Sequence, residues 1–248
     1  MSLLTLPWLG DEPGAPFPDP RTALRDPDGL LALGGDLHPE RLLNAYRAGI
    51  FPWFSEGEPP LWWSPDPRTV FRTDRVATSS RFRRGLRSSR WTVRADTAFE
   101  AVIDACAGIP RRGQRGTWIT ADMREAYVRL HRLGHAHSIE AWDEDRLVGG
   151  VYGVTIGRMF FGESMFSARP DGSKVAIAGL AHRLRAWGWP LVDAQVGNSH
   201  LTALGAESMA RDDFLDALAT LVRSPEVPGS WTVAFGELPA VELSDRAG

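Results

Sequence analysis

The sequence changes its hydrophobic period near residue 135, and this change constrains the fold more than any other feature. Before it, residues 96–108 and 120–134 carry apolar side chains at helical spacing, with Asp96 and Thr120 as expected N-caps. After it, three segments alternate and predict consecutive antiparallel strands: 137–142, 146–157 and 158–167. A helix, a strand and a final helix are then expected, in that order: 173–188, 190–196 and near 211–222. This order predicts an α+β domain.

The first 94 residues carry a different pattern. Residues 1–22 are rich in proline and glycine and predict an irregular arm. A short helix is expected after Pro39, which suits a first helical position, and Gly49 suits the end of that helix. Prolines at 52, 59, 60, 65 and 67 predict that the following stretch forms no regular structure.

Together these segments predict an α+β protein of two parts. A small N-terminal domain, residues 1–94, is expected to pack on a larger domain, residues 95–248. The element order of the larger domain is similar to the GNAT acyltransferase fold, with a mixed, largely antiparallel sheet. A likeness of element order alone assigns no function.

The charge of the chain is unevenly distributed. The net charge of −3 argues by itself against a nucleic-acid partner, but residues 68–94 contain nine arginines against one acid, Asp74. We call residues 68–94 the arginine band. Such a band attracts a polyanion locally, although charge runs are also common as solvated faces. Arg81, Arg83 and Arg84 are the candidates for contacts to nucleic-acid phosphates.

Several features indicate a soluble cytoplasmic protein. Cys106 is the one cysteine, so no internal disulfide can form. The first residues lack the cationic and apolar regions of a secretory signal, and the apolar runs are far shorter than the ~18 residues of a membrane-spanning helix. We therefore expect no membrane partner.

Three polar side chains lie in apolar segments. Strand alternation places Asp193 and Gln195 on one face of residues 190–196, and Glu163 stands among aromatic neighbours. A polar group buried in such a segment is costly unless it is paired, and a carboxyl there has a perturbed pKa. These residues are either a satisfied buried pair or part of a small polar site.

Other kinds of site have weaker support. His135 and His137 lack nearby ligands at metal-binding spacing, so no metal is expected. Ser164 lacks the second glycine of a nucleophile elbow, and Cys106 lies in a predicted helix without an obvious base. No phosphate-binding or dinucleotide fingerprint is present, so no cofactor is expected.

Seven segments, taken in order, carry a resemblance to a known family: GLLALGGDL (29–37), AYRAGIFPWF (45–54), LWWSPDPR (61–68), GTWIT (116–120), AYVRLHRLGHAHSIEAW (126–142), LVGGVYGV (147–154) and FGESMFS (161–167). Over about residues 21–215 the chain resembles the bacterial leucyl/phenylalanyl-tRNA–protein transferase family. The resemblance implies an aminoacyltransferase whose partners are aminoacyl-tRNA and proteins with an N-terminal Arg or Lys. Leucine or phenylalanine, with methionine as a further candidate donor, would be transferred to the α-amine and mark the protein for N-end-rule degradation.

The resemblance also implies roles for particular residues. It assigns catalysis to Asp193, Gln195 and Glu163, with Asp193 orienting Gln195 and attracting the positive charge of the acceptor. Trp53 and Trp118 would contact the terminal adenosine by stacking. The apolar pocket for the transferred side chain would be lined by Val151, Phe160, Gly162, Met165, Leu180, Leu184 and Val192. The arginine band would contact the acceptor stem of tRNA, mainly at phosphates.

Two other functions stay open at this point. A GNAT-type N-acetyltransferase using acetyl-CoA needs a pyrophosphate loop, and residues 169–174 stand at the right junction but have Lys174 where a small residue belongs. A non-catalytic tRNA-binding module would bind tRNA without turnover and be indifferent to Asp193→Ala.

Overall fold

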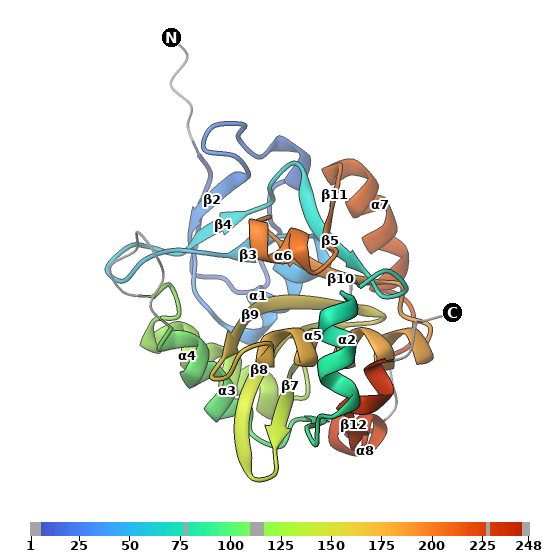
Figure 1. The fold of residues 1–248 in the computed structure, drawn as a ribbon. Helices are drawn as coiled ribbons and strands as arrows, with labels where there is room; N and C mark the ends of the chain where they lie inside the picture. Colours follow the sequence, from blue (N-terminus) through green and yellow to red (C-terminus); the bar gives the residue numbers. More distant parts are fainter. Residues whose placement is uncertain (1–5, 77–78, 110–116, 227–228, 245–248) are drawn as a thin grey trace.

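The computed structural model describes residues 6–76, 79–109, 117–226 and 229–244. It contains two β-sheets with helices packed around them, and the smaller sheet, built by the N-terminal part of the chain, lies at the top of Figure 1. Most of the loop expected between the helices at 96–108 and 120–134, and the first residues of the expected N-terminal arm, lie outside the described residues.

The larger sheet has eight strands and forms the centre of the molecule. In spatial order they are β11 (Glu207–Met209), β5 (Arg68–Arg72), β10 (Leu191–Gln195), β9 (Met159–Ser167), β8 (Arg146–Ile156), β7 (Ala136–Asp143), β6 (Thr92–Ala95) and β12 (Leu238–Pro239). Neighbouring strands are antiparallel except β9 and β10, which run parallel. The α+β class, the mixed and largely antiparallel sheet and the predicted strands β7 to β10 are therefore confirmed.

Apolar side chains from the two faces of this sheet form two separate core clusters. Strand alternation sends Phe161 into the first cluster and Phe160 into the second. The first cluster holds side chains of α1 (Pro39–Arg47), α3 (Phe99–Ala107), α4 (Ala121–Arg132) and α7 (Arg211–Leu221). The second holds side chains of α2 (Ser80–Arg87), α5 (Gly172–Ala186), α6 (Ser199–Ala203), α8 (Trp231–Phe235) and the 3-10 helix η2 (Ala240–Ser244).

The predicted helices are confirmed as α1, α3, α4, α5 and α7, whereas α2, α6 and α8 were not predicted. Both α6 and α8 span only five residues, too short for a periodic pattern to be recognised. Within the described ranges, no helix is long and apolar enough to cross a membrane.

The N-terminal part forms a four-stranded sheet, and the short 3-10 helix η1 (Pro20–Thr22) lies in the loop between its first two strands along the chain. Its strands are, in spatial order, β1 (Trp8–Leu9), β2 (Leu30–Gly34), β4 (Leu61–Trp63) and β3 (Phe51–Pro52). The prediction that the proline-rich stretch forms no regular structure is wrong. Its prolines lie in the edge strand or outside the strands, where a missing backbone N–H costs no ladder bond. Trp62 of β4 is fully buried and donates its indole N–H to the carbonyl of Gly34.

The division of the chain at residue 95 stays a prediction, and the sheet pairing bears on it. Strands β5 and β6 come before residue 95, yet both pair within the eight-stranded sheet. The first core cluster also joins Leu31 and Trp62 of the smaller sheet to Phe214 of α7. Residues on both sides of the predicted division therefore contribute to the larger sheet and to the first core cluster.

The start of α3 differs from the prediction. Asp96 has a backbone φ of 58° and is not the N-cap, because its carboxylate accepts from Ser138 N–H and contacts His137 Nδ1. Glu140 of β7 instead accepts from the backbone N–H groups of Thr97 and Ala98. A carboxylate from a neighbouring strand therefore satisfies donors that a local cap normally satisfies. At α4 the prediction is confirmed, since Thr120 accepts from the N–H of Met123.

The parallel pair β9 and β10 is joined by the crossover helix α5. The first turn of α5 presses on β8 so closely that a Cβ at Gly172 would lie 2.2 Å from the carbonyl oxygen of Val148. The two strands pair only over Met159–Phe161 and Leu191–Asp193, so the carboxyl end of β10 lies beside the middle of the longer strand β9. This register brings Gln195, the last residue of β10, close to Glu163 in the middle of β9.

Candidate active site

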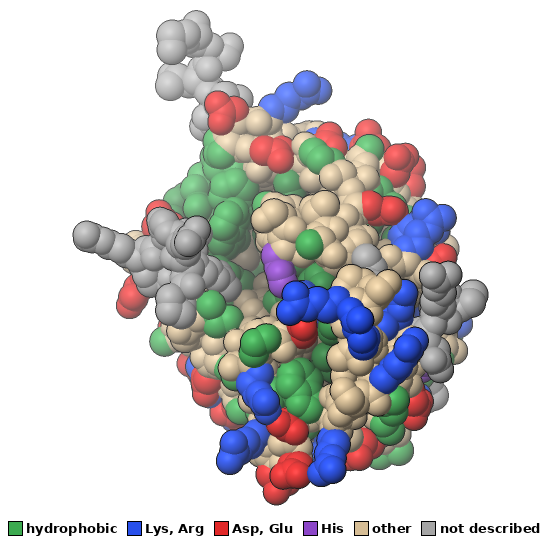
Figure 2. Space-filling view, viewed as in Figure 1, with side chains coloured by type: hydrophobic (Ala, Val, Ile, Leu, Met, Phe, Trp, Pro, Cys, Tyr) green, Lys and Arg blue, Asp and Glu red, His purple; other side chains and the backbone are tan. Residues whose placement is uncertain are grey.

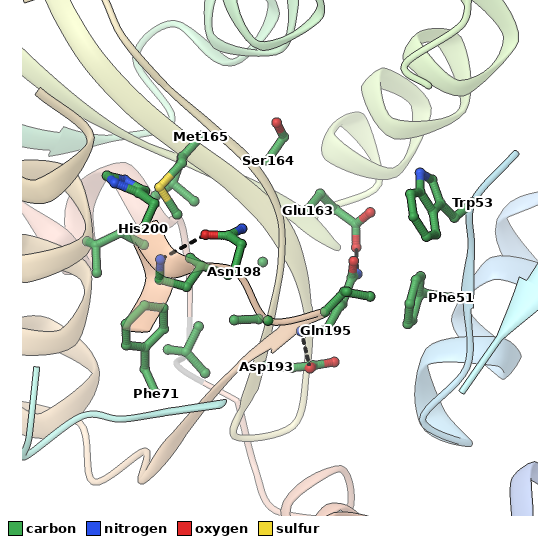
Figure 3. A pocket seen from close by; sticks show the side chains of 18 of the residues that line it. Phe51, Trp53, Phe71, Glu163, Ser164, Met165, Asp193, Gln195, Asn198 and His200 are labelled. Atoms are coloured by element: carbon green, nitrogen blue, oxygen red, sulfur yellow. Dashed lines mark hydrogen bonds between the residues drawn. The ribbon is translucent and has the colours of Figure 1, made fainter. Parts of the chain in front are cut away.

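A cavity of about 510 Å³ opens where β9 and β10 separate. Their pairing ends at Phe161 and Asp193, and the residues that follow on both strands line the cavity. Figure 3 shows Glu163 and Gln195 pointing toward each other, with Phe51 and Trp53 on one side and Met165, Asn198 and His200 on the other. The remaining wall is mainly apolar, as is typical of a small-molecule site.

Glu163 reaches the cavity because β9 contains a bulge. Tyr152 and Gly153 of β8 are adjacent, but they pair with Ser164 and Gly162, so Glu163 is the extra residue. Gly153 stands opposite the bulge, where a Cβ would lie 2.2 Å from the carbonyl oxygen of Phe161. The bulge turns the carboxyl out of the strand ladder and toward α1 and α4.

The carboxyl of Glu163 is within hydrogen-bond distance of three side chains. Tyr46 and Gln195 donate to Oε1 at 2.7 and 2.8 Å, and the hydroxyl of Tyr127 lies 2.8 Å from Oε2. Withdrawal from solvent raises the pKa of Glu163 to about 7, and the nearby charge of Asp193 also raises it, although the hydrogen bonds lower it. This carboxyl therefore titrates near neutral pH.

Gln195 lies at a second irregularity, at the end of β10. The register of β10 with β5 shifts between Asp193 and Gln195, and Gln195 has a φ of 59°, in the left-handed region. Its backbone N–H donates to Asp193 Oδ1 at 2.8 Å. Its side-chain Nε2 donates to Glu163, so Gln195 is held both at its backbone and at its side chain. The side-chain amide oxygen remains available to accept a hydrogen bond.

Asp193 forms a buried ion pair with Arg68. The guanidinium donates through Nε and Nη2 to the two carboxylate oxygens at 2.8 and 2.7 Å, and Nη1 donates to the carbonyl of Gly49. Asp193 is 0% exposed and Arg68 1%. The rings of Phe51 and Phe214 lie 4.8 and 4.7 Å from the guanidinium carbon. Asp193 is thus a neutralised group that fixes the backbone at Gln195.

Arg68 belongs to the arginine band by its position in the sequence, but it is buried beneath the cavity and does not lie on the cationic surface. The available signal was its position at the start of the apolar segment RTVF, where a buried arginine needs an acidic partner. Tyr46 and Tyr127 were not predicted as site residues, although their hydroxyls reach Glu163.

Six of the nine residues expected to contact the donor line the cavity. They are Trp53, Trp118, Val151, Gly162, Met165 and Val192. Phe160, Leu180 and Leu184 are not among its lining residues, since all three are at most 1% exposed and pack in the second core cluster. Phe71, Ile177 and Leu201 provide apolar wall in addition and were not expected.

Arg81, Arg83 and Arg84 lie on α2, apart from Arg68. Arg81 and Arg84 are exposed and Arg83 is half-buried, while Phe82 and Leu86 anchor the helix in the second core cluster. In Figure 2 blue side chains gather over the position that α2 has in Figure 1. The arginine band therefore divides into a buried arginine at the cavity and a cationic helix on the surface.

The geometry suits transfer of an acyl group to an amine. The amide of Gln195 and the carboxyl of Glu163 present hydrogen-bonding groups beside an apolar wall. A site of this kind positions a neutral amine against an activated carbonyl, and the rate of the transfer depends on how well these two groups are oriented. Among the described residues, no cluster of three or more His, Cys, Asp or Glu side chains is arranged to hold a metal ion.

Comparisons with known proteins identify the family. The family model described as "Leucyl/phenylalanyl-tRNA protein transferase" matches residues 70–219, and the model of the N-terminal domain of the same transferase matches residues 35–66. The chain is 64% identical over 241 residues to the leucyl/phenylalanyl-tRNA–protein transferase of Xanthomonas axonopodis pv. citri, covering 97% of each. The corresponding protein of Xylella fastidiosa is 62% identical over 235 residues, with 95% of this chain and 97% of that protein covered. The chain belongs to the leucyl/phenylalanyl-tRNA–protein transferase family, and it is an aminoacyltransferase.

Similarity to solved structures is more distant. The structure of L-PGS from Bacillus licheniformis matches 68% of this chain and 53% of its own, at 12% identity and a TM-score of 0.35. The GNAT-like arrangement stays a prediction.

Proposed function

We propose that the protein transfers leucine or phenylalanine from aminoacyl-tRNA to the α-amine of proteins that begin with Arg or Lys. Methionine is a further candidate donor, and the modified proteins would be degraded by the N-end rule in the cytoplasm. The observation that carries the proposal is the amide of Gln195, held by Asp193 and Glu163 at the edge of an apolar cavity. This placement supports an amine acceptor beside an apolar acyl group.

The chemistry is a substitution at an ester carbonyl. The acceptor nitrogen forms a bond to the carbonyl carbon, the bond to the terminal ribose oxygen breaks, and the proton lost by nitrogen is balanced by one gained at that oxygen. Because the aminoacyl ester is activated, the reaction is downhill. Catalysis then consists of holding the two ends together and stabilising the charge that develops.

Gln195 is the proposed contact to the attacking amine. Since its Nε2 donates to Glu163, its amide oxygen is available to accept a hydrogen from the amine. Asp193 supports this role by fixing the backbone of Gln195. The expected attraction of Asp193 for the acceptor's positive charge finds no support, because Arg68 already neutralises that carboxylate.

The apolar wall is the proposed site of the donor side chain. Val151, Met165 and Val192 line the cavity, and Met165 lies on the side away from Trp53 and Phe51 (Figure 3). A flexible methionine adapts to side chains of different shape. Trp53 is 36% exposed at the rim and packs on Trp63, with ring centroids 5.7 Å apart. An aromatic surface of this kind supports stacking of the terminal adenosine.

Helix α2 is the proposed contact to the tRNA backbone. We expect the triple variant Arg81→Ala/Arg83→Ala/Arg84→Ala to raise KM for aminoacyl-tRNA much more than KM for peptide. Loss of three phosphate contacts also lowers the slope of log affinity against log salt by about 2 to 3. Filter binding of tRNA over a range of salt concentrations measures this slope.

The matched control removes three exposed arginines elsewhere, Arg129, Arg132 and Arg146, from α4 and the start of β8. Equal effects of the two triple variants on KM and on the salt slope would show that α2 has no special part in binding tRNA.

The transfer assay combines the full chain, leucyl-tRNA carrying labelled leucine, and a peptide with N-terminal Arg. We expect label in this peptide and none in the same peptide beginning with Ala. Absence of label from both peptides contradicts the proposed transfer, and equal labelling of both contradicts the basic-residue preference. A rise in melting temperature with CoA, without labelling, would favour an acetyltransferase, and tRNA binding without turnover would favour a non-catalytic module.

A further inference from the structure

Tyr46, Tyr127 and Glu163 place their oxygens in a closed triangle. Tyr46 Oη lies 2.5 Å from Tyr127 Oη and 2.7 Å from Glu163 Oε1, and Tyr127 Oη lies 2.8 Å from Glu163 Oε2. All three distances are those of O–H···O hydrogen bonds, and each such bond needs one proton between its two oxygens.

The number of protons distinguishes the two states of Glu163. The two phenol hydroxyls supply two protons, and an ionised carboxylate supplies none. If both hydroxyls donate to the carboxylate, the two tyrosine oxygens face each other at 2.5 Å with lone pairs alone. The ionised state therefore leaves one of the three contacts without a proton.

A protonated Glu163 satisfies all three contacts. Its Oε2–H donates to Tyr127, Tyr127 donates to Tyr46, and Tyr46 donates to Oε1. In this arrangement Oε1 is the carbonyl oxygen, which has a second lone pair for the amide N–H of Gln195 at 2.8 Å. Each of the three O···O contacts of the triangle then contains one proton.

The surroundings favour the neutral form as well. Both tyrosines are 0% exposed, and the adjacent Asp193 carries the negative charge that Arg68 compensates. Burial is also the main reason why the pKa values of Tyr46 and Tyr127 are raised well above the usual tyrosine value, so both keep their protons. An ionised Glu163 would be a second negative charge, and its hydrogen-bond partners Tyr46, Tyr127 and Gln195 carry no positive charge to compensate it.

We propose that the neutral, protonated form of Glu163 in the free enzyme is held in a hydrogen-bond ring in which Tyr46 and Tyr127 act as positioning residues. The ring fixes Glu163, and Glu163 in turn fixes the amide of Gln195. The catalytic meaning of the ring rests on the proposed function, in which Gln195 contacts the amine. In the neutral state Glu163 orients Gln195, and it does not accept the proton that the amine loses.

The test is an infrared pH titration of the full chain without any substrate. Subtracting the spectrum of Glu163→Gln isolates the carbonyl band of one neutral carboxyl, which we expect on the acidic side of about pH 7 and not on the alkaline side. In the neutral ring Tyr46 donates to the carbonyl oxygen Oε1, and Tyr127 accepts from Oε2–H. We therefore expect Tyr46→Phe and Tyr127→Phe each to move the carbonyl band to higher wavenumber, because each removes a hydrogen bond from the neutral carboxyl.

Tyr152→Phe is the matched control, because the ring of Tyr152 packs 5.6 Å from that of Tyr127, whereas the hydrogen bonds to Glu163 come from Tyr46, Tyr127 and Gln195. It is expected to leave the position of the band unchanged. A band that keeps its wild-type position in both ring variants overturns the proposal, since it would mean that the neutral carboxyl has no hydrogen bonds to the tyrosines. Absence of the band in the wild-type protein overturns it too. Because no transfer is measured, this result is independent of the transfer assay, and either tyrosine variant suffices if the other fails to fold.

Discussion

Arg68→Met is expected to destabilise the protein by about 3 to 5 kcal/mol, because it leaves Asp193 as a buried charge without a partner. For a chain of this size that corresponds to a fall in Tm of roughly 6 to 20 °C. The expectation follows from the burial of both side chains and from the two hydrogen bonds that join them. Thermal unfolding at neutral pH measures the effect.

A double-mutant cycle separates the lost ion pair from lost packing. In Arg68→Met/Asp193→Asn both charges are gone, and the asparagine oxygen can still accept from the N–H of Gln195. We expect the double variant to recover most of the stability lost in Arg68→Met, so that the two changes are strongly non-additive. Additive losses would mean that the arginine stabilises the fold through Phe51 and Phe214 rather than through Asp193.

Gln195→Ala is expected to lower kcat for aminoacyl transfer by about 10²- to 10³-fold, the usual cost of removing one preorganised hydrogen-bonding group. The expected loss is in kcat, with KM for tRNA nearly unchanged, because the amide contacts the reacting amine and not the tRNA backbone. Steady-state kinetics with leucyl-tRNA and an Arg-peptide measure both parameters.

Val233→Ala serves as the surface control for Gln195→Ala, because Val233 is 82% exposed on α8 and lies outside the residues that line the cavity. It should leave kcat unchanged. If Gln195→Ala lowers kcat by less than about tenfold at unchanged Tm, the amide of Gln195 does not contribute to the chemical step.

The large elements of the fold were predictable because they depend on local periodicity. Strands β7, β8 and β9 follow one another with short turns and alternate regularly, and α5 has a long apolar face. The smaller sheet was missed because its strands are short and punctuated by proline. Its stability comes from pairing and from the burial of Trp62, which no local pattern reveals.

The site was predictable in its residues but not in its geometry. Alternation predicted one shared face for Asp193 and Gln195, yet the irregularity at Gln195 sends one side chain to Arg68 and the other to Glu163. A bulge depends on the register of the neighbouring strand, so the chain alone does not show it. Phe160 was predicted to line the donor pocket, but it precedes the bulge of β9, and ordinary strand alternation directs its side chain into the second core cluster.

The pairing of Arg68 with Asp193 joins residues 125 positions apart, a separation at which local sequence carries no information about contact. Tyr46 and Tyr127 show the same limit, since their rings pack in the first core cluster but helical periodicity says nothing about the partners of their hydroxyls. In both cases the missing information was which polar atoms meet inside the fold.

The ring of Phe214 on α7 covers the guanidinium of Arg68 from one side, so α7 supports the cavity although none of its residues is among those that line it. The lining residues lie between Phe51 and Leu201, whereas α7 begins at Arg211. A nascent chain therefore acquires the full support of the cavity only after α7 has been synthesised, later than all the residues that line it.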